Sequence, residues 1–125
     1  MDKTSLFERL GGSAGIRTLV DDIVNRHVEN PRILARFRPY LDQPERLAQI
    51  KEHTCEFLEA GSGGKASYTG KSMIDAHRGM NIDDGEYMAV TDDIIAALRG
   101  RNIDEQTQKD VLMIAYTLRG DILRQ

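Results

Sequence analysis

Cysteine, histidine and tryptophan are scarce in this sequence, which has one cysteine, Cys55, three histidines and no tryptophan. A single cysteine excludes a disulfide within the chain. No run approaches the roughly 18 consecutive apolar residues that a membrane-spanning helix needs, and the first residues lack the pattern of a secretory signal. The sequence therefore predicts a cytoplasmic protein with no membrane contact.

An excess of one charge is also missing. The chain has 17 Lys and Arg residues against 20 Asp and Glu, a formal net charge of −3, and the two signs are interspersed. Nucleic-acid binding is disfavoured, because it needs a basic face. A length of 125 residues with 40% hydrophobic side chains predicts a single globular domain over residues 1–125. No partner signature is present, so we expect a monomer or a weak homo-oligomer.

The apolar residues have helical spacing almost throughout, and the predicted fold class is all-α. Ser5 and Glu8 have the capping-box spacing of a short first helix, which the Gly11-Gly12 pair ends. We expect Ser13 to cap a second helix and Asn30-Pro31 to end it. Its buried stripe is predicted to consist of Ile16, Leu19, Val20, Ile23, Val24, His27 and Val28.

A connector is predicted to follow the second helix, and Pro44 fits the first turn of the third. The glycine-rich segment 61–70 is predicted to break regular structure, and a brief helix around residues 73–77 follows it. Two longer helices come last, one opened by Asp83 and followed by Gly100, the other capped by Asp104. The sequence thus predicts five or six helices with one glycine-rich loop between them.

Common catalytic motifs do not fit. A phosphate-binding loop needs glycine at position 59 and a hydroxyl residue after Lys65, but the chain has Glu59 and Ala66 there. A di-iron bundle needs Glu-x-x-His pairs, and neither His53 nor His77 has a glutamate three residues before it. Cys55 has no informative spacing to a histidine, which favours an ordinary helix residue.

The histidines remain as candidates for chemistry. His27 lies on the apolar stripe of the second helix, where a neutral imidazole bonded to a backbone carbonyl is the expected structural role. His77 stands beside Met73 on a short helix that faces apolar residues of longer helices. A haem needs one neutral imidazole for its iron and a broad apolar pocket for its ring, and both are available around His77.

Several motifs resemble one family over nearly the whole chain. They are L-F-E-R-L-G-G at 6–12, V-D at 20–21, P-R-I at 31–33, F-L at 57–58 with G-G at 63–64, and Y-T-G-K-S-M-I-D-A-H at 68–77. Together they resemble the truncated haemoglobins, the short two-over-two globins, and most closely their first group. The resemblance implies a two-over-two helical sandwich that binds one haem b.

The resemblance also implies roles for individual residues. His77 matches the proximal iron ligand, and the free ring nitrogen is expected to donate to a backbone carbonyl one helical turn back. Lys71 matches a basic residue that pairs with a haem propionate, although a solvated lysine also explains it. The other implied haem contacts, for which ordinary core packing is the alternative, are Phe37, Phe57, Leu58, Tyr68, Met73, Ile82, Tyr87, Val90 and Ile94.

The gas-binding side departs from the family pattern. Val24 stands where the family commonly has tyrosine, and Ile50 and Thr54 stand where it often has glutamine. Thr54 can donate a hydrogen bond, though a helical threonine often bonds to the carbonyl four residues back. His53 matches a position at which some members place a sixth iron ligand, so it either approaches the iron or points outward to a propionate.

The resulting functional hypothesis is reversible binding of dioxygen, carbon monoxide or nitric oxide at haem iron. One alternative is an enzyme, a nitric-oxide dioxygenase or a peroxidase-like catalyst, the former with a reductase partner. Another is a redox or gas-sensing haemoprotein in which His53 is the sixth ligand. The sequence does not separate these alternatives.

Overall fold

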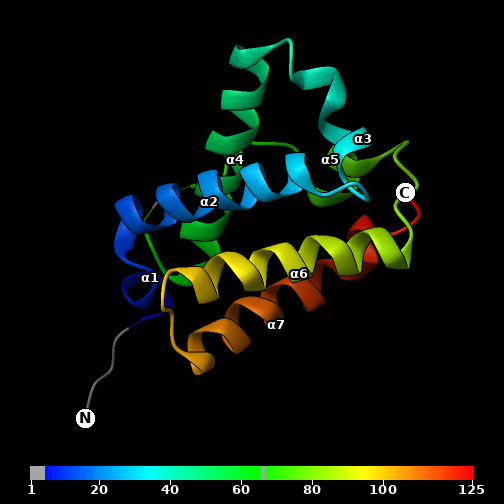
Figure 1. Ribbon diagram of the computed structural model, residues 1–125. Coiled ribbons are helices and arrows are strands. Elements are labelled where there is room, and N and C mark those ends of the chain that lie inside the picture. Colours follow the sequence, from blue (N-terminus) through cyan, green and yellow to red (C-terminus); the bar gives the residue numbers. More distant parts are fainter. Residues whose placement is uncertain (1–4, 66) are drawn as a thin grey trace.

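The structure is a computed structural model that describes residues 5–65 and 67–125 (Figure 1). Within these residues the chain forms α1 (Leu6–Arg9), α2 (Gly12–Glu29), α3 (Leu34–Phe37), the 3-10 helix η1 (Arg38–Tyr40), α4 (Pro44–Ser62), α5 (Met73–His77), α6 (Asp84–Gly100) and α7 (Glu105–Ile122). The all-α prediction is confirmed. The domain predicted over residues 1–125 also takes in residues 1–4 and Ala66, which lie outside the described residues.

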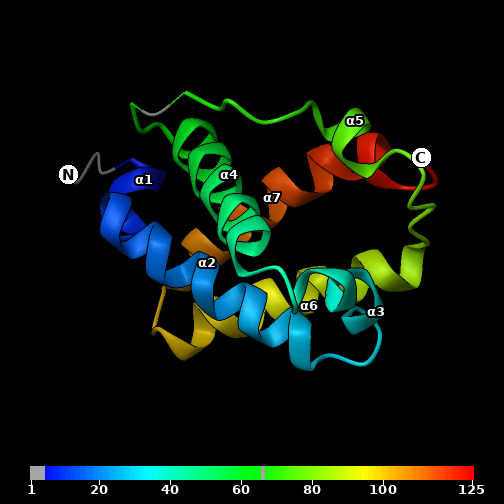
Figure 2. The same ribbon diagram turned by 90° about the horizontal axis from the view of Figure 1, so that it is seen from above.

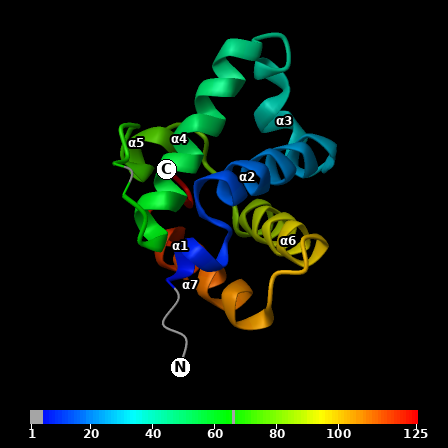
Figure 3. The same cartoon turned by 90° about the vertical axis from the view of Figure 1, so that its left-hand side faces the viewer.

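Two pairs of helices build the fold. Helix α2 packs against α4 and α6, and α6 packs against α7. Figures 1 and 3 show α2 and α4 above α6 and α7, and Figure 2 shows α5 close to the C-terminal end of α7. No helix among the described residues is long and apolar enough to span a membrane.

Local signals fix most of the helix starts. Ser5 and Glu8 form the predicted capping box of α1, and Asp83 and Glu86 form that of α6. The Asp104 side chain accepts a hydrogen bond from the backbone of Thr107 at the start of α7, as predicted. These caps satisfy amide groups that a helix start leaves without a partner, which explains why the sequence reveals them.

Some predicted boundaries were wrong. Helix α2 begins at Gly12, because Gly11 takes a left-handed conformation with φ of +95° and reverses the chain before Ser13. Ser13 is therefore inside α2, where its hydroxyl donates to Glu59 Oε1 at 2.5 Å. The predicted loop 61–70 also begins later, since α4 runs to Ser62, and Gly100 belongs to α6 rather than lying beyond it.

The connector after α2 is more regular than predicted, because α3 and η1 occupy most of it. An ion pair attaches this connector to α6. Arg36 on α3 donates to both carboxylate oxygens of Glu86 on α6, at 2.7 and 2.8 Å. This hydrogen bond is the main cause of the lowered pKa of Glu86. The pair holds Phe37, the last residue of α3, beside the start of α6.

The hydrophobic core consists of two separate clusters. The larger joins α2, α4, α6 and α7 around Ile16, Val20 and Leu98, which are fully buried. The smaller contains Ile82, Tyr87 and Ile122 and lies where α5, α6 and α7 meet. A domain usually builds one main core with smaller satellite clusters, and the cluster around Ile82, Tyr87 and Ile122 is such a satellite, which lies beside α5.

Candidate functional site

His77 is the last residue of α5, and its imidazole has a defined orientation. The Ser72 side chain caps α5 by accepting from the backbone of Asp75, and this fixes the first turn. His77 Nδ1 lies 2.8 Å from the backbone oxygen of Met73, which accepts hydrogen bonds and has no proton to give. Nδ1 therefore carries the proton, and Nε2 has a free lone pair. This is the hydrogen bond that the sequence predicted, one turn back along the chain.

The chain that follows His77 is held by the C-terminus. The carbonyl oxygen of Gln125 accepts backbone hydrogen bonds from Gly79 at 3.1 Å and from Asn81 at 3.0 Å, and Arg124 donates to Ile82 at 3.0 Å. Ile82 and Leu123 form an isolated parallel bridge. These bonds fix both ends of the short segment that leads from α5 to α6.

The segment before α5 is attached to α4. The Glu56 carboxylate accepts from the backbone and from the hydroxyl of Thr69, at 3.0 and 2.8 Å, and these two bonds lower the pKa of Glu56. The Tyr68 ring packs edge-on against Phe57, with centroids 5.4 Å apart, and its hydroxyl donates to the backbone oxygen of Lys71 at 2.6 Å. Burial raises the pKa of the Tyr68 hydroxyl.

Several predicted site residues come together here. His53 lies edge-on to Tyr68 with ring centroids 6.2 Å apart, so His53, Phe57 and Tyr68 form one aromatic group between α4 and the loop. The Lys71 side chain is exposed. Helical spacing places His53 and Phe57 on one face of α4 together with Ile50, within about 60° of one another around the helix axis.

Most of the predicted contacts are only half-buried, although apolar side chains of this kind are usually buried. Some of them pack against a buried cluster: Phe37, Leu58 and Ile94 against the larger, and Met73 against the smaller, which contains Ile82 and Tyr87. The half-buried set consists of Phe37, Ile50, His53, Thr54, Phe57, Leu58, Tyr68, Met73, His77, Val90 and Ile94. A broad apolar cofactor fits such a set, because it would cover these side chains and join the clusters.

The Thr54 hydroxyl bonds within its own helix, as the sequence analysis considered, and so is not free to donate to a bound gas. Its hydroxyl donates to the backbone oxygen of Ile50 at 2.8 Å, so the one hydroxyl proton is already used. Val24 is 4% exposed and belongs to the larger cluster. At the three positions that depart from the family pattern, the structure therefore offers two aliphatic side chains and a hydroxyl whose proton is occupied.

His27 is buried, as predicted, but its partner was predicted wrongly. Nδ1 bonds to the Asp93 carboxylate on α6 at 2.8 Å instead of to a backbone carbonyl, and Asn30 donates to both oxygens of the same carboxylate at 3.3 Å. The reason is geometric, since α6 crosses α2 at this point and presents the Asp93 carboxylate to the ring. Burial lowers the pKa of His27 against the opposing effect of Asp93.

Cys55 does not form a second functional site. Cys55 is 2% exposed, lies in the larger cluster, and burial raises the pKa of its thiol. In residues 5–65 and 67–125 no group of three or more His, Cys, Asp and Glu side chains could hold a metal ion. A haem iron needs only one protein ligand, so the lack of a three-ligand group says nothing against His77 as a ligand.

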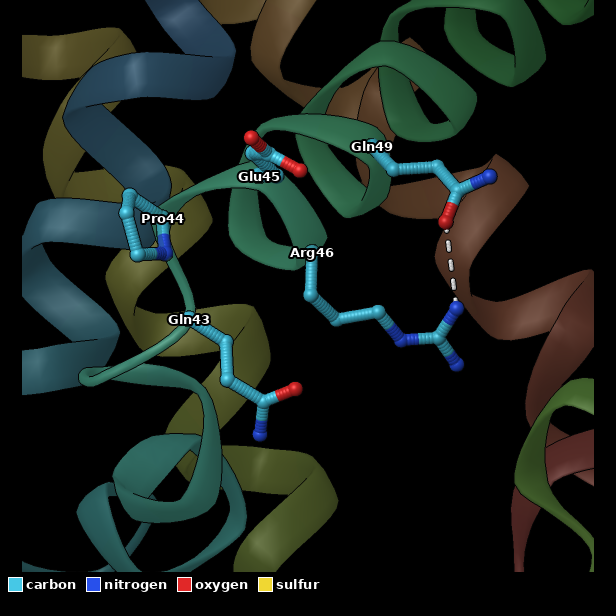
Figure 4. Close-up of a pocket in the computed structure, with 5 residues that line it drawn as sticks. All are labelled: Gln43, Pro44, Glu45, Arg46 and Gln49. Carbon is cyan, nitrogen blue, oxygen red and sulfur yellow. Dashed lines mark hydrogen bonds between the residues drawn. The ribbon is translucent and has the colours of Figure 1, made fainter.

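A cavity of about 720 Å³ lies at the N-terminal end of α4 (Figure 4). It is lined by Gln43, Pro44, Glu45, Arg46 and Gln49, none of which was predicted as a site residue. A sequence signal was nevertheless present, because Arg46 precedes Ile50 by four residues and His53 by seven. These intervals place Arg46 on the same face of α4 as the predicted contacts.

Comparison with known proteins identifies relatives along almost the whole chain. Residues 5–124 match the model of the bacterial-like globin family. The chain is 26% identical over 119 residues to a group 1 truncated hemoglobin of Tetrahymena thermophila, covering 95% of this chain and 94% of the relative. It is 28% identical over 116 residues to the group 1 truncated hemoglobin GlbN of Synechocystis, covering 90% of each.

Solved structures show the same fold. The truncated hemoglobin from Tetrahymena pyriformis in its Fe(III) form superposes with a TM-score of 0.89 at 21% identity, covering 98% of this chain and all of the other. The 2/2 hemoglobin from Synechococcus, in the cyanomet state and with covalently attached heme, gives a TM-score of 0.83 at 24% identity and covers 96% and 98%. The predicted two-over-two helical fold is therefore confirmed.

Proposed function

Because this chain belongs to the bacterial-like globin family, as a truncated haemoglobin with group 1 relatives, we propose that it holds one haem b without a covalent bond and binds diatomic gases reversibly. Membership of this family implies haem binding. The observation that carries the proposal is the imidazole of His77, which Met73 orients, together with the half-buried apolar residues of α4, α5 and α6. A haem held there would supply an iron able to bind dioxygen, carbon monoxide or nitric oxide.

His77 is the residue that would ligate the iron. The proton on Nδ1 is committed to the Met73 carbonyl oxygen, so Nε2 presents a lone pair in a fixed direction. Such a hydrogen bond at the second nitrogen fixes the ring orientation and raises the basicity of a metal-binding histidine. Phe57, Leu58 and Ile94 would contact the ring edge and faces and keep water from the iron.

Binding without a covalent bond is supported by where the nucleophilic side chains lie. Cys55 is 2% exposed and packs in the larger cluster, about 180° around α4 from Arg46. The buried His27 is bonded to Asp93. Extraction with acidified acetone should transfer all of the haem to the organic phase. Haem that stays with the protein, with the mass of the chain raised by one haem, would contradict this part of the proposal.

The experiment that tests the function is titration of the purified protein with haemin, followed by reduction and carbon monoxide. We expect a Soret band that saturates at one haem per chain and shifts with carbon monoxide. In His77→Gly the band should weaken and broaden, and added imidazole should restore it by occupying the place of the side chain. Absence of a saturable Soret band in the unmodified protein would overturn the proposal, and an unchanged band in His77→Gly would overturn the role of His77.

Reversible gas binding is favoured over oxidative turnover by the side chains at the three positions that depart from the family pattern. Turnover with dioxygen requires a stable oxygenated state, which hydrogen-bond donors support. Val24 and Ile50 have no donor in their side chains, and Thr54 donates to Ile50 instead. We therefore propose that ligands which need no donor, carbon monoxide and nitric oxide, are held more firmly relative to dioxygen than in a pocket that supplies one.

A further inference from the structure

Arg46, a residue that lines the cavity at the N-terminal end of α4, carries a positive charge that no carboxylate among the described residues balances. Arg46 Nη1 donates to Gln49 Oε1 at 3.1 Å, and its guanidinium carbon lies 6.0 Å from the centre of the Tyr40 ring. Among the described residues no carboxylate lies within 4.0 Å of Arg46, although Glu45 is its neighbour in the chain. Figure 4 shows the Arg46 side chain extending from α4 into the open space.

Several other arginines are paired, although among the described residues Arg32, Arg38, Arg99 and Arg101 have no ion pair either. Arg36 binds Glu86, Arg17 binds Glu52 and Arg9 binds Asp110, with nitrogen–oxygen distances between 2.7 and 2.9 Å. The Arg46 guanidinium is instead bonded to a neutral carboxamide, which leaves most of its donors for a ligand. A planar guanidinium binds a carboxylate or a phosphate through two parallel hydrogen bonds, and the propionates of a haem are carboxylates.

The position of Arg46 relates this cation to the proposed haem site. Arg46 continues the face of α4 that carries Ile50, His53 and Phe57, one turn closer to the start of the helix than Ile50. The apolar part of that face suits the ring of a haem, and the polar end, with Gln43 and Gln49, suits its carboxylates. The cavity is open to solvent and all of its lining residues are exposed, so a carboxylate at the edge of a bound cofactor could reach Arg46.

We propose that Arg46 binds a propionate carboxylate of the haem, with Gln49 orienting the guanidinium. This inference rests on the proposed haem binding and adds a residue that the family pattern did not indicate. Arg46 then binds one carboxylate at the N-terminal end of α4. Lys71, which is exposed in the segment between α4 and α5, can bind the other. In the free protein Gln49 holds the guanidinium extended, so little side-chain freedom is lost on binding.

The test measures the rate of haemin loss to an excess of a haem-scavenging apoglobin, with two cofactors. One is haemin and the other is haemin dimethyl ester, in which both carboxylates are blocked. For Arg46→Gln we expect haemin loss about three- to tenfold faster than for the unmodified protein, and Arg46→Lys should lie between the two. With the dimethyl ester, the unmodified protein and Arg46→Gln should lose the cofactor at the same rate.

The control is Arg38→Gln, because Arg38 is also exposed and close in sequence but does not line the cavity. It should leave both rates unchanged. Equal acceleration of haemin and dimethyl ester by Arg46→Gln would show that Arg46 acts through the fold, and no acceleration would show that it binds no carboxylate. Either result overturns the inference while haem binding stands, whereas failure of the unmodified protein to bind either cofactor overturns the proposed function itself.

Discussion

His27 on α2 and Asp93 on α6 are joined across the helix crossing by a 2.8 Å hydrogen bond between Nδ1 and Oδ2. The imidazole is 7% exposed and packs against Phe37, with ring centroids 5.8 Å apart. Burial lowers the pKa of His27 below the ordinary value of about 6.5 for a histidine, and Asp93 offsets this only in part. The bond therefore links two layers of the fold through a histidine that resists protonation.

This pair makes the free energy of unfolding depend on pH. The unfolded chain takes up the His27 proton as the pH falls through 6.5, while the folded chain takes it up only at lower pH, so stability decreases on acidification in that interval. The contribution of one proton is at most about 1.4 kcal/mol per pH unit. Urea unfolding at pH 7.5 and 5.5 should show a smaller loss in His27→Gln, whose amide can still donate to Asp93. An equal loss in both proteins would contradict the assignment.

A second prediction concerns close packing at the start of α2. A Cβ atom on Gly15 would lie 2.2 Å from the backbone oxygen of Leu10, so the chain there has to shift to accept any other residue. Gly15→Ala should lower the free energy of unfolding by about 1–3 kcal/mol, as overpacking does.

The matched control is Gly61→Ala, near the end of α4, where an added Cβ meets nothing within 4 Å. It should raise the free energy of unfolding by about 0.5–1 kcal/mol, because alanine is the better helix former. Urea denaturation of both variants checks the pair. The packing argument fails if the two substitutions change stability in the same direction.

The sequence predicts local features well and long-range ones poorly. The capping residues Ser5, Asp83 and Asp104 were identified because each bonds within a few residues of itself. The pairing of His27 with Asp93 was not, since 66 residues separate them and only the crossing of α2 and α6 brings them together. The ligand role of His77 and its hydrogen bond to a backbone carbonyl were predicted from the resemblance to a family, because helical periodicity does not indicate either.

In the candidate site, too, local contacts were predicted and long-range features were missed. The bond from Thr54 to Ile50 was anticipated, because it lies within one helix turn. Arg46 was missed although its spacing to Ile50 and His53 is readable, because a charge at the start of a helix usually faces solvent. Its relevance follows from the cavity and from the lack of a nearby carboxylate among the described residues, which the helical spacing alone does not reveal.

A third prediction addresses the gas ligand through Thr54. Thr54→Val removes the hydroxyl and keeps the shape, and since the proton is already bonded to Ile50, the rate of dioxygen release should change by less than about twofold. Thr54→Gln introduces a longer donor on the same face and should slow release about ten- to a hundredfold. Stopped-flow mixing of the oxygenated protein with dithionite measures both. A large acceleration in Thr54→Val would show that the hydroxyl leaves Ile50 for the ligand.

The last prediction concerns His53. The edge-on contact with Tyr68, whose hydroxyl is fixed to the Lys71 carbonyl oxygen, holds the His53 ring at the loop side of α4. We therefore expect the haem protein to be five-coordinate when reduced, with a ferric low-spin fraction that His53→Leu leaves unchanged. Tyr68→Ala removes the contact and should raise the low-spin fraction, because the imidazole is then free to reach the iron. In the double variant His53→Leu, Tyr68→Ala this increase should disappear. Absorption spectra of the ferric proteins decide the matter, and a low-spin signal that is strong in the unmodified protein and lost in His53→Leu would instead make His53 the sixth ligand.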